Sequence, residues 1–214
     1  MNKNTSTNQW HKYIRRDISP VLAHWTKPSR KETFSGEVIS DYTAYDILEK
    51  ILLEYTLLGG TGWIKGSFKC VCFTEAPINE MVSIFNYVYN DLTDNTIDYH
   101  PFGIAVKKNY LFDKGGRPVI YQTNNEYDEL PIKLKWRHKI YEPSNNIDFT
   151  WEREWRVLAD TFQLEPYEIS IFVPNAGYHQ KILNNTQIDS KFKNRIINLS
   201  TFGLQYEWQS PNGN

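Results

Sequence analysis

Residues 151–158 have the sequence WEREWRVL, and this stretch decides the expected fold. Aromatic and β-branched residues favour a strand, and successive side chains of a strand point to opposite faces of its sheet. Alternation therefore predicts two sets of side chains, with Trp151, Arg153, Trp155 and Val157 on one face and Glu152, Glu154 and Arg156 on the other. Two tryptophans on one face favour a central strand that is covered on both sides.

The segments around this strand define the fold class. Strand patterns occur at residues 21–25, 68–74, 102–106, 118–122, 167–173 and 195–199. Helical spacing of apolar residues predicts helices over 42–58 and 78–89, with shorter ones near 110–114 and 176–183. Strands and helices do not alternate regularly, so we expect an α+β fold with a mixed, mostly antiparallel sheet and flanking N-terminal helices. We also expect a polar loop over residues 28–41 and a mobile insertion over residues 123–146.

Length and composition favour one domain over residues 1–214, with flexible ends at 1–10 and 210–214. The hydrophobic fraction of 40% excludes global disorder, because it supplies enough apolar surface to offset the entropy of folding. A formal net charge of -1 means that any nucleic-acid site has to be a local basic patch.

The N-terminal residues contain no apolar run of signal-peptide length, and no segment has the roughly 20 apolar residues needed to cross a bilayer. We therefore expect a cytoplasmic protein with no membrane contact. The two cysteines, Cys70 and Cys72, have no His or Cys cluster beside them, so we expect buried thiols and no metal site. Motifs for P-loop hydrolysis, Rossmann redox chemistry and zinc proteolysis are missing from the sequence.

Each candidate site residue also has a structural interpretation. Two carboxylates and a guanidinium on one strand face form either a tuned polar site or an exposed set of cross-strand ion pairs. His24 and Thr26 alternate with Trp25, so both could line a site or be satisfied by backbone carbonyls. Thr74 could cap the following helix. Tyr121 could be a half-buried sheet tyrosine.

Five windows, taken in order, resemble the AbiGi-like abortive-infection proteins of bacterial anti-phage systems. They are LAHWTK (22–27), AYDILEKILLEYTLLGG (44–60), CVCFTEAPI (70–78), PFGIAVKKNYLFDKGGRPVIY (101–121) and FTWEREWRVLAD (149–160). More distantly, the layout resembles the ADP-ribosyltransferase fold, including the DNA-modifying toxins of toxin–antitoxin pairs. Those enzymes have an early strand with a His or Arg that holds NAD, a middle strand with an aromatic or hydroxyl residue, and a late strand with a catalytic Glu.

The resemblance implies an NAD-dependent ADP-ribosyltransferase with a split, mostly antiparallel sheet. Glu154 would stabilise the ribosyl cation and Glu152 would activate the acceptor. NAD would be held by His24 and Thr26 of the early element, by either Phe73 and Thr74 or Tyr121 as the middle element, and by Arg156 of the late strand. Arg156 could instead keep Glu154 ionised. Alternation along the two strands predicts that the side chain of His24 and both carboxylates open into the same cleft. If His24 lies on the far side of the sheet from Glu154, this NAD model fails.

The implied partners are NAD, an RNA or DNA acceptor, and a cognate antitoxin or chaperone. Basic residues that could contact phosphates occur at Lys107, Lys108, Lys114 and Arg117, and again at Lys133, Lys135, Arg137, His138 and Lys139. Trp136 and Tyr141 lie within the second group and could stack on bases, although both groups could also be ordinary solvated surface. The alternative function is a catalytically inactive relative that binds or senses a phage product or a toxin.

Overall fold

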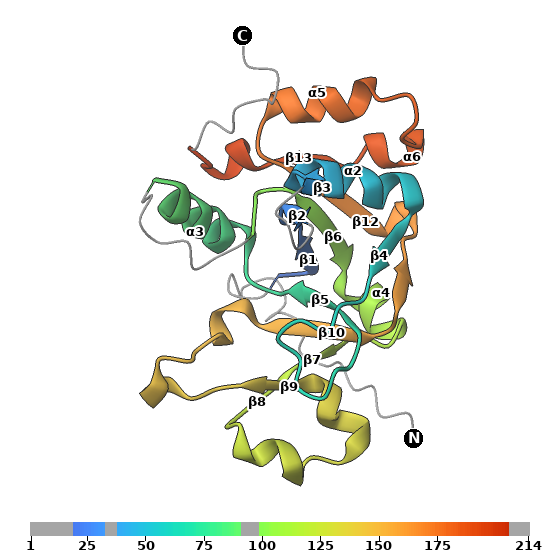
Figure 1. Ribbon diagram of the computed structural model, residues 1–214. Helices are drawn as coiled ribbons and strands as arrows, with labels where there is room; N and C mark the ends of the chain where they lie inside the picture. Colours follow the sequence, from blue (N-terminus) through green and yellow to red (C-terminus); the bar gives the residue numbers. More distant parts are fainter. Residues whose placement is uncertain (1–18, 33–37, 91–98, 206–214) are drawn as a thin grey trace, which may run out of the picture.

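The computed structural model describes residues 19–32, 38–90 and 99–205, so the ends that were expected to be flexible lie outside the described part (Figure 1). Its helices are α2 (Ala44–Glu54), α3 (Ile78–Asn90), α4 (Lys108–Asp113), α5 (Ala176–Asn184) and α6 (Ser190–Lys193). Its strands are β1 (Val21–Trp25), β2 (Ser29–Glu32), β3 (Val38–Tyr42), β4 (Thr56–Leu58), β5 (Cys70–Thr74), β6 (Gly103–Lys107), β7 (Arg117–Pro118), β8 (Ile120–Gln122), β9 (His138–Ile140), β10 (Glu154–Leu158), β11 (Thr161–Gln163), β12 (Ile169–Val173) and β13 (Ile196–Asn198).

The main sheet has seven strands in the order β13-β12-β6-β1-β5-β10-β7. Every neighbouring pair is antiparallel except β12 and β13, which are parallel, so the expected α+β class with a mostly antiparallel sheet is confirmed. β1 pairs with β6 over five residues but with β5 only at Ala23 and Thr74. The two halves of the sheet therefore meet at a single pair of residues, between β1 and β5.

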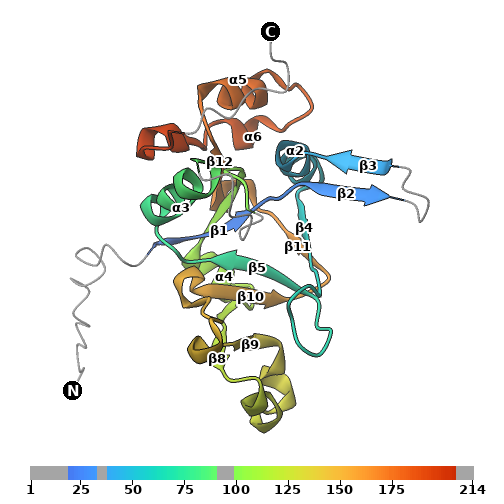
Figure 2. The ribbon, with the colours of Figure 1, turned by 60° about the vertical axis from the view of Figure 1, so that its left-hand side comes forward.

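Helices cover both faces of the sheet. On the first face, α2 buries Tyr45, Leu48 and Leu52 in the larger core, which also contains Leu22, Phe73 and side chains of α5 and α6. On the second face, α3 buries Met81, Val82 and Phe85 against Ala23, Trp25 and Phe172. In Figure 2, β1 leads from beside α3 to the hairpin of β2 and β3 on the other side of the view. This hairpin occupies the segment predicted to be a polar loop.

Helix α2 is shorter than predicted. A capping box fixes its start, because the hydroxyl of Thr43 accepts from the amide of Asp46 and the Asp46 carboxylate accepts from the amide of Thr43. The helix ends at Tyr55, which has a left-handed φ of 56°. Residues 56–58 then pair with 161–163, so this tertiary pairing, rather than Gly59 and Gly60, ends the helix.

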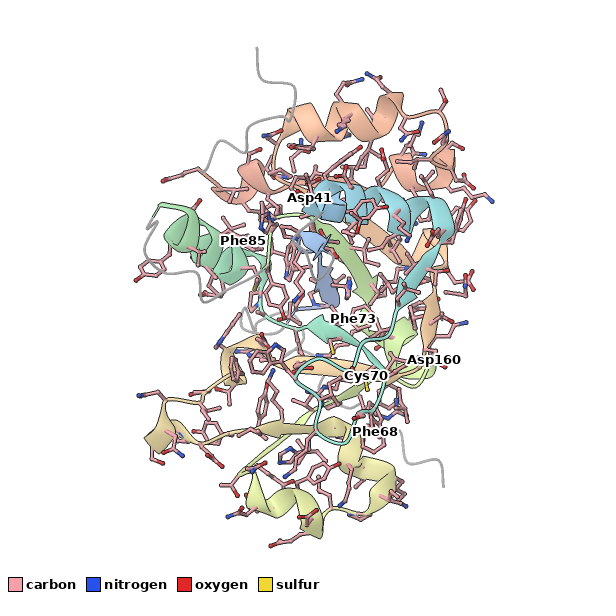
Figure 3. All side chains as sticks on the ribbon, viewed as in Figure 1. Asp41, Phe68, Cys70, Phe73, Phe85 and Asp160 are labelled. Atoms are coloured by element: carbon pink, nitrogen blue, oxygen red, sulfur yellow. The ribbon has the colours of Figure 1, made fainter. Side chains whose placement is uncertain are left out.

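The segment 119–149 forms a lobe beside β10, at the end of the sheet opposite α5 and α6 (Figures 1 and 2). The predicted strand over 118–122 is divided at Val119, because β7 pairs with β10 whereas β8 pairs with β9 in parallel. Trp136 packs with Ile64 and Cys70 in a small separate core. In Figure 3, Phe68 lies below Cys70, on the side of the lobe. The stretch expected to be a mobile insertion is thus packed against the sheet.

The close approach of β1 and β6 requires glycine at position 103. A Cβ atom there would lie 2.4 Å from the carbonyl oxygen of His24 and 3.1 Å from Cα of Trp25. We expect Gly103→Ala to lower the free energy of unfolding by about 1–3 kcal/mol, because the backbone of β1 has to shift. Chemical denaturation checks this, with Gly60→Ala as the control, since a Cβ there meets no atom within 4 Å. Equal stability of the two variants would contradict it.

Candidate active site

The site begins with two ionised side chains on β10. Register places Glu154 opposite Thr74 and Arg156 opposite Cys72, all on the second face of the sheet. Nε of Arg156 lies 2.7 Å from Oε1 of Glu154, and the Arg156 side chain is 1% exposed. Nη1 of Arg156 donates to the carbonyl oxygens of Trp136 and His138, each at 2.8 Å. Arg156 therefore contacts Glu154 and joins the lobe to the sheet. The contact with Glu154 is the one that Arg156 would need to keep Glu154 ionised; the contacts with the lobe were not predicted.

A second carboxylate and a lysine complete the cluster. Nζ of Lys139, on β9, lies 3.0 Å from Oε2 of Glu154 and 3.5 Å from Oε2 of Glu152. The hydroxyl of Tyr99 lies 3.5 Å from Oε1 of Glu152. All four charged side chains of the cluster are at most 13% exposed. Two carboxylates and two cations are thus enclosed together, and the sequence does not single out Tyr99 or the bridging role of Lys139.

The two carboxyl groups have pKa shifts of opposite sign. Burial raises the pKa of Glu152 above its ordinary value, and the attraction of Lys139 only partly offsets this. Burial acts on Glu154 in the same direction, but Arg156 and Lys139 outweigh it and lower the pKa of Glu154. Neighbouring groups whose environments separate their pKa values are suited to different catalytic tasks, one as a fixed anion and the other as a proton carrier.

Glu152 does not lie on a strand, contrary to the alternation prediction. Residues 150–152 form a 3-10 turn, Arg153 has a left-handed φ of 46°, and β10 starts only at Glu154. Thr74 and Tyr121 hydrogen-bond the backbone of this turn, which explains why the strand begins late. Nζ of Lys139 nevertheless contacts the carboxylates of both Glu152 and Glu154, so the structure brings the two predicted catalytic residues together.

His24 lies on the opposite face of the sheet from Glu154, and the prediction of one shared cleft is wrong. The register of Ala23 with Thr74, and of Thr74 with Glu154, puts these three on the second face. His24 follows Ala23 and so points to the first face, where its ring meets that of Phe73 edge to face at 5.8 Å. Nδ1 of His24 lies 2.8 Å from the carbonyl oxygen of Cys72, which links β1 to β5 where they separate.

The half-buried His24 should make the fold sensitive to acid. Burial lowers the pKa of His24 below 6.5, although the contact with the Cys72 carbonyl acts against this. The unfolded chain therefore takes up the proton first, so this part of the stability is complete above about pH 6.5 and is lost as the pH falls. We expect His24→Gln to lose less unfolding free energy than the parent between about pH 7.5 and about pH 5.5. Chemical denaturation at several pH values measures this; identical pH dependence of both proteins would refute it.

The other predicted NAD residues have partners within the chain. Thr26 is buried and donates to the carbonyl of Ala44 at 2.8 Å, whereas Phe73 is 2% exposed in the larger core. Thr74 donates to the carbonyl of Glu152 at 2.5 Å, and Tyr121 donates to the carbonyl of Phe149 at 3.2 Å. These contacts position backbone and core. A direct role of these residues in holding NAD stays a prediction.

The second basic group has few side chains that a nucleic acid could reach. Trp136 is 9% exposed and His138 is 2% exposed, so stacking of Trp136 on a base would require it to leave its core. Lys139 is occupied by the carboxylates. The most exposed large hydrophobic side chain of the described residues is Trp63, at 92%, two positions before Lys65 on the loop that packs against the lobe.

The two cysteines are buried or half-buried, and burial raises the pKa of Cys70 to about 11 and that of Cys72 further. Both thiols stay protonated at neutral pH, which makes them poor nucleophiles.

Within the described ranges, every helix is too short or too polar to span a membrane. Comparison of the chain with protein-family models, with curated proteins and with solved structures finds no match.

Proposed function

We propose that this protein is an NAD-dependent ADP-ribosyltransferase with its active site at Glu152 and Glu154. The observation that carries the proposal is the enclosed carboxylate pair, in which the pKa of Glu154 is lowered and that of Glu152 is raised. Glycosidic bond cleavage through a ribosyl cation uses such a pair, one carboxylate to stabilise positive charge and one to move a proton.

The reaction follows from these two roles. The bond between the nicotinamide nitrogen and C1′ of its ribose breaks, and nicotinamide leaves with the bonding electrons as a neutral molecule. Ionised Glu154 stabilises the cation that develops at C1′. The acceptor attacks C1′ and loses its proton to Glu152, whose raised pKa makes it a stronger base than an ordinary carboxylate.

Sheet order supports NAD as the substrate in this proposal. With Phe73 and Thr74 as the middle element, the strands that the resemblance assigns to NAD binding and catalysis are β1, β5 and β10, which are neighbours in the sheet. We propose that this is a split sheet of the ADP-ribosyltransferase type, divided between β1 and β5, which pair only at Ala23 and Thr74.

The acceptor in this proposal is a macromolecule, and we favour RNA or DNA. The exposed lysines that could contact phosphates are Lys107, Lys114 and Lys133. Lys107 and Lys114 would exchange their exposed contacts with Glu168 and Glu165 for phosphate oxygens. Trp63 offers an exposed ring for stacking. The biological setting that we propose is cytoplasmic anti-phage defence or a toxin held inactive by a cognate antitoxin or chaperone.

A direct test is the release of nicotinamide from NAD by the purified protein, followed by mass spectrometry. The expected result is nicotinamide formation above the rate of spontaneous hydrolysis, together with label transfer from radiolabelled NAD to total RNA, DNA or protein. A folded protein that releases no nicotinamide with any of these acceptors would remove the enzyme proposal.

A second candidate function is a catalytically inactive module that binds or senses a phage product or a toxin. The position of His24 favours it, because an NAD site that uses this side chain together with Glu154 would need groups from both faces of the sheet. Arg156 and Lys139 also neutralise Glu154 without any substrate. Absence of NAD turnover together with specific binding of a phage or toxin protein would support this candidate.

A further inference from the structure

The turn that carries Glu152 is held in an unfavourable backbone conformation. It runs from Phe149 to Glu154, includes the 3-10 turn Thr150–Glu152, and has Arg153 in the left-handed region at a φ of 46°. Residues other than glycine rarely adopt this backbone conformation, so contacts with neighbouring groups have to hold it in place. The turn decides where the carboxylate of Glu152 lies relative to Glu154.

Thr74, at the end of β5, and the next residue, Glu75, hydrogen-bond the backbone of the turn. The hydroxyl of Thr74 donates to the carbonyl oxygen of Glu152 at 2.5 Å, and the amide of Glu75 donates to the same oxygen at 3.2 Å. The Thr74 oxygen in turn accepts from the amide of Ala76 at 3.1 Å. The hydroxyl hydrogen is therefore directed at Glu152, and Thr74 is buried, with 7% of its surface exposed.

Tyr121 of β8 holds both ends of the same turn. Its hydroxyl donates to the carbonyl oxygen of Phe149 at 3.2 Å and accepts from the amide of Glu154, also at 3.2 Å. Burial raises the pKa of Tyr121 to about 12, so the phenol keeps the hydrogen that it donates. One hydroxyl thus spans the turn from its first residue to its last.

We propose that Thr74 and Tyr121 are positioning residues, whose hydroxyl groups fix the 149–154 turn and so place the Glu152 carboxylate beside Lys139 and Glu154. Neither residue has to touch the substrate for this role. The catalytic meaning of the proposal rests on the proposed function, whereas the placement of Glu152 does not.

Thr74→Val and Tyr121→Phe test the proposal, since each removes one hydroxyl and keeps the shape of the side chain. The titration of Glu152 is followed by carbon-13 NMR of its carboxyl carbon, assigned with Glu152→Gln. We expect the pKa of Glu152 to fall toward its ordinary value in both variants, because a loosened turn admits water to a carboxyl group whose burial is the main cause of its shift.

Matched controls separate positioning from general stability. Tyr55→Phe removes a hydroxyl that donates to Asp189, and Thr56→Val removes one that donates to the carbonyl of Glu54, both away from the turn. These variants should leave the Glu152 titration unchanged, and Thr74→Ser should restore it. A Glu152 titration identical in the parent, Thr74→Val and Tyr121→Phe would overturn the proposal.

The assay of NAD chemistry gives a separate readout. If the parent is active, both variants should lower label transfer by about tenfold to 100-fold, the loss expected from a misplaced catalytic group. An inactive parent would refute the proposed function, while the NMR titration would still decide whether Thr74 and Tyr121 place Glu152.

Discussion

Glu154→Gln should lower nicotinamide release from NAD by about 10²–10³-fold, because it removes one preorganised charge that stabilises the ribosyl cation. The substitution keeps the shape of the side chain and one hydrogen-bond acceptor for Arg156. It also takes the negative charge from a buried ion pair whose arginine is 1% exposed, so the variant loses stability as well. The rate is therefore measured at a temperature where circular dichroism shows both proteins folded.

Glu152→Gln should differ from Glu154→Gln in its effect on nicotinamide release. A residue that only activates the acceptor is dispensable for release of nicotinamide to water but needed for transfer, so release should persist while label transfer falls. Glu165→Gln is the matched control, since Glu165 is exposed and lies 3.9 Å from the ammonium of Lys114. A folded Glu154→Gln protein with parental activity would remove Glu154 from the mechanism and leave the binding module as the better account.

Arg156→Met should cost about 3–5 kcal/mol of unfolding free energy, the usual loss when one partner of a buried ion pair is removed. The change leaves Glu154 with Lys139 as its remaining cation and deprives the carbonyls of Trp136 and His138 of their donor. We therefore expect the lobe to detach from the sheet first. Chemical denaturation measures the loss, and hydrogen exchange of residues 119–149 reports where it begins.

Two further variants make the Arg156 result specific. Arg195→Met removes one exposed hydrogen bond, to the carbonyl of Tyr167. It should lower the free energy of unfolding much less than Arg156→Met does. The double variant Glu154→Leu with Arg156→Met removes both charges, so it should recover much of the stability that Arg156→Met loses. A double variant less stable than Arg156→Met would contradict the view that the Glu154 carboxylate, left with Lys139 as its only cation, causes the loss.

The alternation of side chains along each segment predicts most of the strands of the sheet, because this alternation does not depend on which strands pair. The predicted strand over residues 21–25 matches β1, and the helix predicted over 78–89 matches α3 to within one residue. The helix predicted over 42–58 is wrong at its end, where pairing of β4 with β11 overrides helical spacing. Such pairing joins residues about a hundred positions apart and leaves no local signal.

The sequence by itself determined the α+β class and the choice of Glu152 and Glu154 as the residues to examine, since each depends on composition or on neighbours along the chain. The Glu154 strand was predicted to be central but lies next to the edge strand β7, and Trp151 and Trp155 pack in different cores. Only the tertiary structure decided that Glu152 comes from a turn, that Lys139 lies between the carboxylates, and that His24 faces away from them. Those facts depend on strand register and on long-range hydrogen bonds, and a register shift of one residue moves every side chain to the other face.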